Sequence, residues 1–164
     1  MILSPSRSGQ TPRNHHASVV IAGDRGIMLR GPSGAGKTAL SLALLDWCKA
    51  ANRFGCLVSD DQVLLGRSGA QIVAEAPPTI EGLMELRGFG PIKVRCERRT
   101  LLDLVVDLVD ADRAPRFQPD ERVSLLGVSL PYLAIDSAVR PLPAVHAILA
   151  RLGESPCGVR EGDG

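Results

Sequence analysis

The segment from residue 31 to residue 38 constrains this chain more than any other, because it reads GPSGAGKT and fits the pattern GxxxxGK(S/T). In this pattern, small residues let backbone N–H groups surround a phosphate, the lysine adds positive charge, and the hydroxyl can ligate Mg²⁺. The segment therefore predicts a nucleotide phosphate site made by Gly31, Pro32, Ser33, Gly34, Ala35, Gly36, Lys37 and Thr38.

The residues on either side of this P-loop strengthen the prediction. Ile27 to Arg30 is a short apolar run typical of a buried strand, and the chain from Ala39 to about Ala50 has no Gly or Pro, which favours a helix. A helix that begins at the loop directs its positive dipole end and free N–H groups at the phosphates. The alternative is a Gly-rich turn that binds no ligand, and the strand–loop–helix context argues against it.

Composition narrows the function classes. The 164 residues suit one domain, and 19 Lys plus Arg against 18 Asp plus Glu give no electrostatic case for binding nucleic acid or a membrane surface. Aromatic residues make up only 3%, which also argues against base stacking, and no apolar run is long enough to span a membrane. Four scattered cysteines without a CxxC pair favour free thiols and a cytoplasmic location.

Hydrophobic patterns predict a mixed, strand-rich α/β domain over residues 15–152, with an unstructured segment before it (1–14) and a flexible tail after it (153–164). Strands are expected at Ala17 to Ala22, Ile27 to Arg30, Cys56 to Ser59, Val63 to Leu65, Gln71 to Ala74, Ile92 to Val94, Val123 to Leu130 and Leu133 to Ile135. Short helices are expected at Ile80 to Leu86 and Ala144 to Leu152, and Leu101 to Val109 fits a strand or a helix.

Two neighbouring carboxylates, Asp60 and Asp61, follow the apolar run that ends at Ser59. In P-loop proteins an acidic residue at the end of such a strand faces the metal and the reacting phosphate. One carboxylate can hold Mg²⁺ water while the other accepts a proton from an incoming hydroxyl. The alternative is an exposed turn capped by Asp, and the strand behind the P-loop favours the functional interpretation.

Four segments together resemble a known family. HASVV from residue 16, the P-loop, LVSDDQV from residue 57 and MELRGFGPIKV from residue 84 occur in the order found in the C-terminal catalytic domain of HPr kinase/phosphorylase. The resemblance covers about His16 to Leu152, without the N-terminal domain of longer members, and ELRGFG is its most specific part because it is similar to the family's EIRGLG. It implies a single α/β P-loop kinase domain of the HPr kinase/PEP carboxykinase-like type, a strand-rich mixed sheet with few helices.

The resemblance also implies an activity and site residues. The family transfers phosphate from ATP with Mg²⁺ to a serine of HPr, the phosphocarrier protein of the bacterial phosphotransferase system. His16 matches the family's active-site histidine, and Asp61 matches the base that deprotonates the serine. Asp60 would support that base or the metal. On residue type alone, an ordinary surface histidine is the stronger interpretation of His16, and the matched spacing to the P-loop favours the functional one.

Further matches concern the metal and the transferred phosphate. Glu85 matches the family's second Mg²⁺ ligand, beside Thr38; the alternative is an ordinary glutamate on a helix surface. Arg116 has the spacing of the family's catalytic arginine, although Arg113 lies close to it and a solvated loop arginine is an equal alternative.

The family's segment for the reverse, phosphorolytic reaction is matched here only by Val139, Arg140 and Pro141, which argues against that reaction. The resemblance implies a homo-oligomer, a hexamer in the family. Two other functions stay open: a P-loop kinase of a small metabolite, and a nucleotide-sensing module without catalysis.

Overall fold

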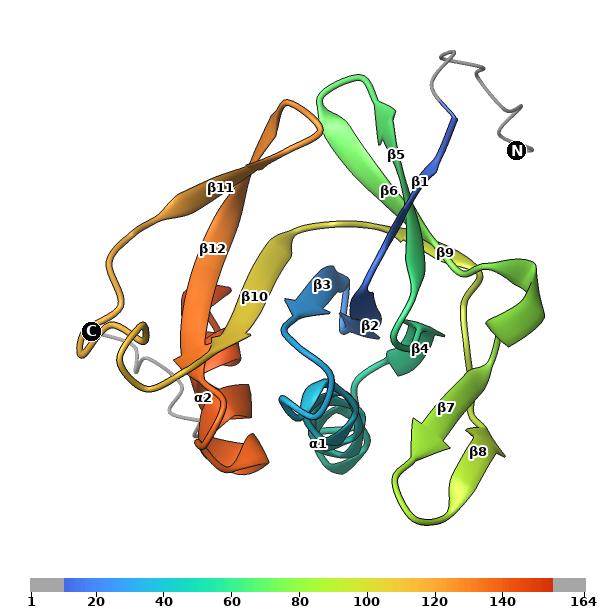
Figure 1. The fold of residues 1–164 in the computed structure, drawn as a ribbon, viewed down its shortest axis with the longest axis horizontal. Coiled ribbons are helices and arrows are strands. Elements are labelled where there is room, and N and C mark those ends of the chain that lie inside the picture. The colour runs from blue at the N-terminus through green and yellow to red at the C-terminus, as the bar shows by residue number, and fades with distance from the viewer. Residues whose placement is uncertain (1–10, 155–164) are drawn as a thin grey trace.

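The computed structural model describes residues 11–154, which form a strand-rich α/β fold with two helices in that range (Figure 1). The strands are β1 Arg13–His15, β2 Ala17–Ala22, β3 Arg25–Arg30, β4 Gly55–Ser59, β5 Val63–Ser68, β6 Gln71–Glu75, β7 Leu83–Leu86, β8 Gly90–Lys93, β9 Arg99–Leu101, β10 Leu104–Val109, β11 Arg122–Leu125 and β12 Val128–Asp136. The helices are α1 Lys37–Ala50 and α2 Pro141–Arg151, and Pro78–Ile80 forms a 3₁₀ turn, η1.

A six-stranded sheet in the order β11-β12-β10-β3-β2-β4 forms the centre of the fold. β3, β10 and β12 run parallel, whereas β2 lies antiparallel to both β3 and β4. Helices α1 and α2 cover one face of this sheet, as Figure 1 shows, and the apolar core between them includes Ile27, Leu29, Leu44, Leu104 and Ile148. The P-loop follows β3, so it lies at the carboxyl ends of the parallel strands, where open α/β sheets bind their ligands.

A four-stranded sheet in the order β1-β5-β6-β9 covers part of the opposite face. Its inward residues, among them Val63, Leu65 and Ile72, pack with Met28 and Val105 of the central sheet in a second apolar cluster. Strand β1 pairs with β5, and β2 follows after a single residue, His16. His16 therefore lies at the junction of the two sheets.

The structure contradicts the helix expected from Ile80 to Leu86. Gly82 has φ +72, which interrupts a helix, and the following residues form β7, which pairs with β8 in a separate two-stranded sheet. Met84 is buried and Glu85 is exposed, so the side chains alternate with the two-residue period of a strand. Apolar residues at 80, 83, 84 and 86 fit both the 3.6-residue period of a helix and the two-residue period of a strand. Gly82 is the sequence signal that favours the strand over the helix.

Two other expectations need correction, and one open alternative is decided. The single strand expected from Val123 to Leu130 is a hairpin, because Leu126 and Gly127 both have positive φ and form the two-residue turn between β11 and β12. The ambiguous segment from Leu101 to Val109 is the end of β9 followed by β10. Residues 13 and 14, expected to be unstructured, pair with β5 instead; residues 1–10 and 155–164 lie outside the described part of the chain.

Cys48, Cys56 and Cys96 are free thiols, as expected, and Cys157 lies outside the described residues. Burial raises the pKa of the Cys56 thiol to about 11, which favours the unreactive protonated form. Within residues 11–154, neither helix has the length and apolar character needed to cross a membrane.

Candidate active site

The P-loop turns sharply from β3 into α1. Gly34 and Gly36 have φ +81 and +98, a region that L side chains adopt only with strain, and a Cβ at Gly36 would meet no atom within 4 Å. The loop therefore leaves open space in front of the first N–H groups of α1, as an anion site requires. Gly31 is needed for a different reason, since a Cβ there would lie 3.0 Å from the carbonyl oxygen of Leu108.

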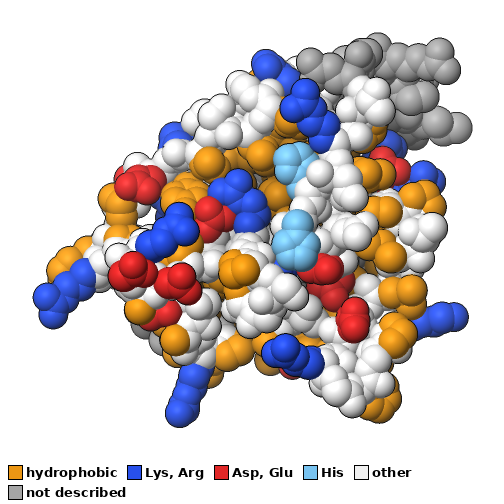
Figure 2. All heavy atoms as spheres, viewed as in Figure 1, with side chains coloured by type: hydrophobic (Ala, Val, Ile, Leu, Met, Phe, Trp, Pro, Cys, Tyr) orange, Lys and Arg blue, Asp and Glu red, His pale blue; other side chains and the backbone are white. Residues whose placement is uncertain are grey.

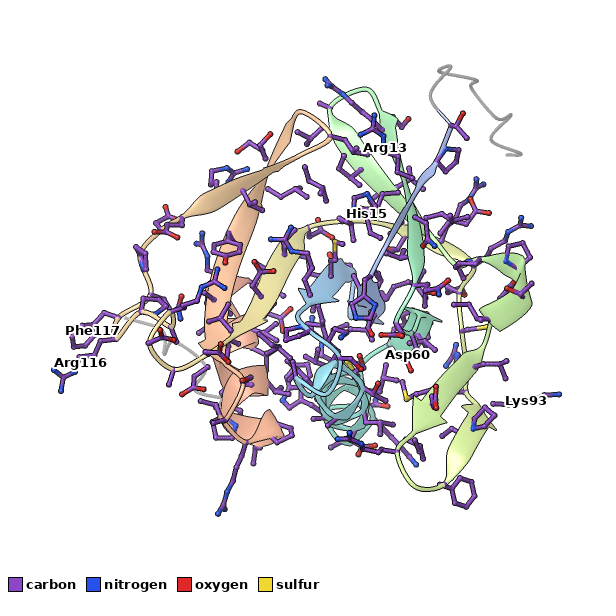
Figure 3. The ribbon with its side chains drawn as sticks, viewed as in Figure 1. Arg13, His15, Asp60, Lys93, Arg116 and Phe117 are labelled. Carbon is purple, nitrogen blue, oxygen red and sulfur yellow. The ribbon has the colours of Figure 1, made fainter. Side chains whose placement is uncertain are left out.

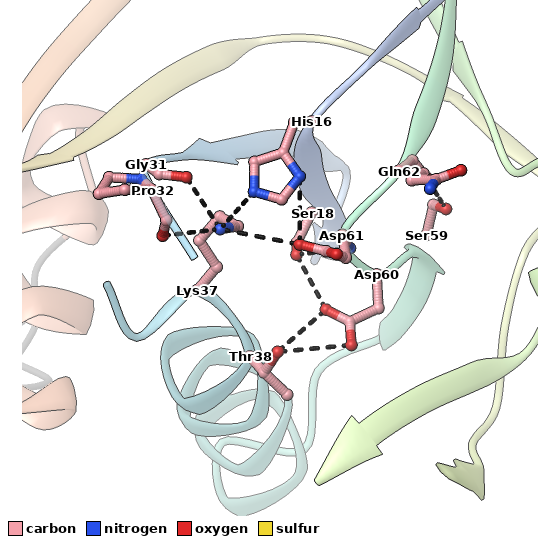
Figure 4. A network of polar contacts seen from close by, with 10 residues as sticks. All are labelled: His16, Ser18, Gly31, Pro32, Lys37, Thr38, Ser59, Asp60, Asp61 and Gln62. Carbon is pink, nitrogen blue, oxygen red and sulfur yellow. Dashed lines mark hydrogen bonds and ion pairs between the residues drawn. The ribbon is translucent and has the colours of Figure 1, made fainter. Parts of the chain in front are cut away.

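Lys37 is almost fully buried, with 5% of its side chain exposed, and it is held on several sides (Figure 4). Its Nζ donates hydrogen bonds to the carbonyl oxygens of Gly31, at 2.9 Å, and Pro32, at 3.1 Å. A third contact, of 3.3 Å, joins Nζ to Nε2 of His16. The ammonium is therefore fixed over the P-loop, where a nucleotide phosphate would receive its charge.

His16 connects Lys37 to Asp61. Because Nε2 faces the donating ammonium, the ring proton of a neutral His16 belongs on Nδ1. Nδ1 lies 3.4 Å from Oδ1 of Asp61, and the same oxygen is 3.8 Å from Nζ of Lys37. The Asp61 side chain is 61% exposed, so an incoming group can reach its carboxylate while Lys37 stays buried behind it. In the space-filling view, a histidine adjoins acidic side chains on this face (Figure 2).

Asp60 lies deeper and faces a different set of groups. Its carboxylate accepts hydrogen bonds from Oγ of Ser18 at 2.9 Å, from Oγ1 of Thr38 at 3.1 Å and from the backbone N–H of Glu85 at 3.1 Å. These donors come from β2, α1 and β7, so one carboxylate ties three elements together. Ser18 also accepts a hydrogen bond from the N–H of Asp61, at 3.1 Å.

The backbone explains why two neighbouring aspartates face different partners. The pairing of β2 with β4 shifts register between Val19 and Val20, and such irregularities often re-aim side chains beside active sites. Asp61 has φ +65, in the left-handed region that Asp tolerates better than most residues. The chain therefore turns sharply after β4, and Asp60 faces Thr38 while Asp61 faces His16 and Lys37.

A pocket of about 380 Å³ lies over the P-loop. Its walls include Lys37, Thr38, both aspartates, Glu85 and Arg87, the last two from β7 and the turn that follows it. A Cβ placed on Gly34 would lie 3.9 Å from Nη1 of Arg87, so this guanidinium reaches toward the P-loop. The pocket brings a lysine, an arginine and three carboxylates to one space, which suits a phosphate and its metal ion.

The donor set of this pocket fits Mg²⁺. The ion prefers hard oxygen ligands and keeps several waters, and Thr38, Asp60 and Glu85 supply one hydroxyl and two carboxylates. The hydrogen bond from Thr38 to Asp60 joins the two residue types that hold the metal in P-loop NTPases. Among the described residues, no group of three or more His, Cys, Asp and Glu side chains forms a metal site of protein ligands alone.

The sequence-predicted residues His16, Lys37, Thr38, Asp60, Asp61 and Glu85 all lie in or beside this pocket. Arg116 does not. It is exposed in the loop between β10 and β11, and Figure 3 shows it at the outer edge of the molecule, pointing away from Asp60. Arg113, its alternative, is exposed in the same loop.

Sequence reasoning missed two residues of the site. Ser18, fully buried, joins Asp60 to the backbone of Asp61, and a lone serine inside an apolar strand was the only signal for it. Arg87 lies in the ELRGFG segment that carries the family resemblance, but its approach to the P-loop depends on how the β7–β8 hairpin folds back.

A second polar cluster lies on the central sheet beside the P-loop. Arg30, the last residue of β3, donates to both carboxylate oxygens of Asp107 on β10, with Nη2 at 2.8 Å, and the Tyr132 hydroxyl donates to the same carboxylate at 3.0 Å. Burial and the neighbouring Asp107 charge raise the pKa of Tyr132 to about 12. The cluster fixes the end of β3 from which the P-loop starts.

Comparison with known proteins gives consistent matches. The family profile described as HPr Serine kinase C-terminal domain matches residues 10–141. The HPr kinase/phosphorylase of Geobacter sulfurreducens is 31% identical over 156 residues, covering 85% of this chain and 46% of the relative. The relative from Caldicellulosiruptor bescii with the same name is 30% identical over 138 residues, covering 77% of this chain and 42% of the relative. The chain therefore spans less than half the length of these relatives.

A solved structure shares the fold. The Hpr(Ser) kinase/phosphatase from Coxiella burnetii superposes with a TM-score of 0.71 at 22% sequence identity, covering 86% of this chain and 92% of that one. At this identity the similarity establishes the fold, a P-loop kinase fold, and the expected fold class is confirmed.

Proposed function

Because the chain belongs to the HPr Serine kinase C-terminal domain family, we propose that it is an ATP-dependent kinase that phosphorylates a serine of the phosphocarrier protein HPr. The observation that carries the proposal is the accessible carboxylate of Asp61, 3.8 Å from the buried P-loop lysine. That arrangement sets a proton acceptor beside the position of the terminal phosphate, as transfer to a hydroxyl requires. A cytoplasmic location belongs to the same proposal, and the free cysteines support it.

In this proposal the triphosphate of ATP lies over the P-loop. The N–H groups at the start of α1 and the ammonium of Lys37 bind the phosphates, and Arg87 adds a second positive charge from the other wall. Lys37 exchanges its hydrogen bonds with the carbonyls of Gly31 and Pro32 for phosphate oxygens. Charge that develops on the transferred group is stabilised without further rearrangement of the protein.

Thr38, Asp60 and Glu85 would hold Mg²⁺. The bound ion would neutralise charge on the terminal phosphates. Asp60 suits this task because its hydrogen bonds with Ser18, Thr38 and the Glu85 backbone fix its carboxylate. Prior orientation of that kind avoids an entropy cost during the reaction.

Asp61 acts as the general base. It accepts the proton of the acceptor serine as the serine oxygen forms a bond to the γ-phosphorus and the bond to the ADP oxygen breaks. His16 orients the carboxylate through Nδ1, and the contact of Nε2 with Lys37 fixes the ring. The 61% exposure of Asp61 leaves room for a serine on a protein surface.

Arg116 has no step in this mechanism, because the loop that carries it does not line the pocket. Phosphorolysis is also outside the proposal. Arg140, the residue left from the family's segment for that reaction, is exposed at the start of α2 and likewise does not line the pocket. The homo-oligomer that the family resemblance implies is part of the proposal, and light scattering checks it.

The test is transfer of labelled phosphate from Mg-ATP to HPr, with Lys37→Ala as the inactive control. We expect phosphoserine on HPr with the wild-type protein only. ATP turnover that rises with a small metabolite and ignores HPr would instead identify a metabolite kinase. ATP binding without any transfer would identify a nucleotide-sensing module, and either result would refute the proposal.

A further inference from the structure

A second hollow, of about 250 Å³, adjoins the pocket over the P-loop. It shares Asp60, Asp61 and Glu85 with the pocket over the P-loop. The rest of its wall is mostly apolar, with Ile80 from η1, Leu83 from β7 and Pro91 from β8. Asp61 therefore borders both the phosphate pocket and a partly apolar hollow.

The β7–β8 hairpin contributes residues to both spaces. Glu85 pairs directly with Pro91, so these residues and Leu83, two positions before Glu85, lie on one face of the hairpin. Met84 and Ile92 lie on the other face and pack with the core under α1. The hollow is thus formed by the hairpin face that the core does not use.

Leu83 and Ile80 are only half-buried, and Pro91 is exposed. We propose that the hollow binds an apolar side chain of the acceptor protein next to the serine that is phosphorylated. This inference rests on the proposed function, because it assigns the substrate contact of the same site. A side chain seated there would hold the neighbouring hydroxyl beside Asp61, which also lines the nucleotide pocket.

The size and chemistry of the hollow favour this occupant. An apolar cavity of roughly 150 Å³ holds a benzene molecule, so about 250 Å³ accommodates one aliphatic or aromatic side chain. Gln62 and the three carboxylates are the polar part of the lining, but Ile80, Leu83 and Pro91 offer a small polar metabolite no hydrogen-bonding side chain. A folded protein surface, in contrast, can present an apolar residue and a serine together.

The energetic consequence is a contribution to acceptor binding and not to the chemical step. Loss of one apolar contact of this size weakens binding by about tenfold. Leu83→Gln should therefore raise KM for HPr by about tenfold, with kcat and KM for ATP unchanged. Leu83→Met, which keeps an apolar side chain of similar volume, should restore KM to within about twofold of wild type.

The experiment measures steady-state phosphorylation of HPr by wild type, Leu83→Gln and Leu83→Met. The matched control is Leu142→Gln, which removes an apolar side chain that is 61% exposed on α2, outside both pockets. A raised KM for HPr in Leu83→Gln alone supports the inference. An unchanged KM, or a fall in kcat with unchanged KM, overturns it and leaves the kinase activity in place.

The two proposals fail differently. Wild-type protein that binds Mg-ATP and leaves HPr unmodified refutes the kinase function, and the assignment of the hollow falls with it. Wild-type protein that phosphorylates HPr while Leu83→Gln behaves like Leu142→Gln refutes only the acceptor subsite. Loss of folding in Leu83→Gln would appear as a lowered unfolding midpoint, and the comparison is then made with Pro91→Ser, which leaves the core face of the hairpin intact.

Discussion

The residues around the P-loop and the arginines of the loop from residue 110 to residue 121 differ in how the fold holds them. Lys37, Asp60 and Asp61 each contact groups from other segments at distances between 2.9 and 3.8 Å. Arg113 and Arg116 are exposed and make no contact with the pocket. Their loop is held by local hydrogen bonds to Asp110, by the Gln118 side chain, which donates to the Ala134 carbonyl, and at its end by Arg151, which contacts Asp120 and Glu121. Both sets match family positions, yet only the first forms a site.

The difference has a physical cause. Hydrogen bonds between paired strands fix the positions of residues at the strand ends. Ser18, Arg30 and Asp60 lie in or next to paired strands, so their relative positions are fixed. A loop rich in proline and charge has no ladder of hydrogen bonds, and a spacing match says little about where its side chains lie. Substitutions in the pocket should therefore change function, whereas substitutions of the exposed loop arginines should not.

Apart from removal of the Asp61 carboxylate, the largest expected effect is the loss of Lys37. Lys37→Met removes the buried charge over the P-loop and should lower the rate of phosphoryl transfer on the order of 10²–10³-fold. The control is Lys49→Met, which removes an exposed lysine at the other end of α1 and should keep the wild-type rate. Equal rates for the two variants would contradict the assigned role of Lys37.

The next largest expected effect is the loss of stability in Ser18→Ala. The change removes one hydrogen bond from the fully buried Ser18 to Asp60 and leaves the partly buried Asp61 N–H without its acceptor. We expect the free energy of unfolding to fall by about 1–3 kcal/mol in urea denaturation. Ser124→Ala, at an exposed position on β11, should change it by less than about 0.5 kcal/mol.

Two arginines give the clearest contrast between the pocket and the loop from residue 110 to residue 121. Arg87→Ala should weaken binding of Mg-ATP about tenfold, because the guanidinium faces the P-loop. Arg116→Ala should leave the Kd unchanged, as measured by calorimetry. A Kd that rises in Arg116→Ala would show that the loop reaches the nucleotide, contrary to the arrangement described.

The smallest effect is spectroscopic. Tyr132 is the single tyrosine of the chain, so phenolate absorbance reports on it alone. Its pKa is raised from 10.0 to about 12, so its contribution to stability is full below pH 10 and is lost as pH rises toward 12. The native absorbance midpoint should lie near 12, and Asp107→Asn should lower it. A native midpoint near 10 would contradict the burial and hydrogen bond of Tyr132.

Much of this site could be predicted from sequence, because its parts have local signals. The P-loop has a fixed pattern, and Asp60 and Asp61 directly follow an apolar strand. The β7 strand was predicted as a helix because apolar spacing there suits both periods, and that error left Glu85 on the wrong kind of element. Sequence spacing gave no information on whether Arg87 or Arg116 approaches the phosphates, because that depends on tertiary packing.

In the proposed mechanism Asp61 accepts the proton of a protein serine, Lys37 binds the phosphates of the nucleotide, and Asp60 would hold the metal ion. One measurement tests it directly: single-turnover phosphorylation of HPr by wild type and Asp61→Asn, each with a measured Kd for Mg-ATP. We expect the Kd for Mg-ATP to be unchanged in Asp61→Asn and the rate of phosphoserine formation to fall on the order of 10²–10⁴-fold. Phosphoserine formed by Asp61→Asn at the wild-type rate would contradict it.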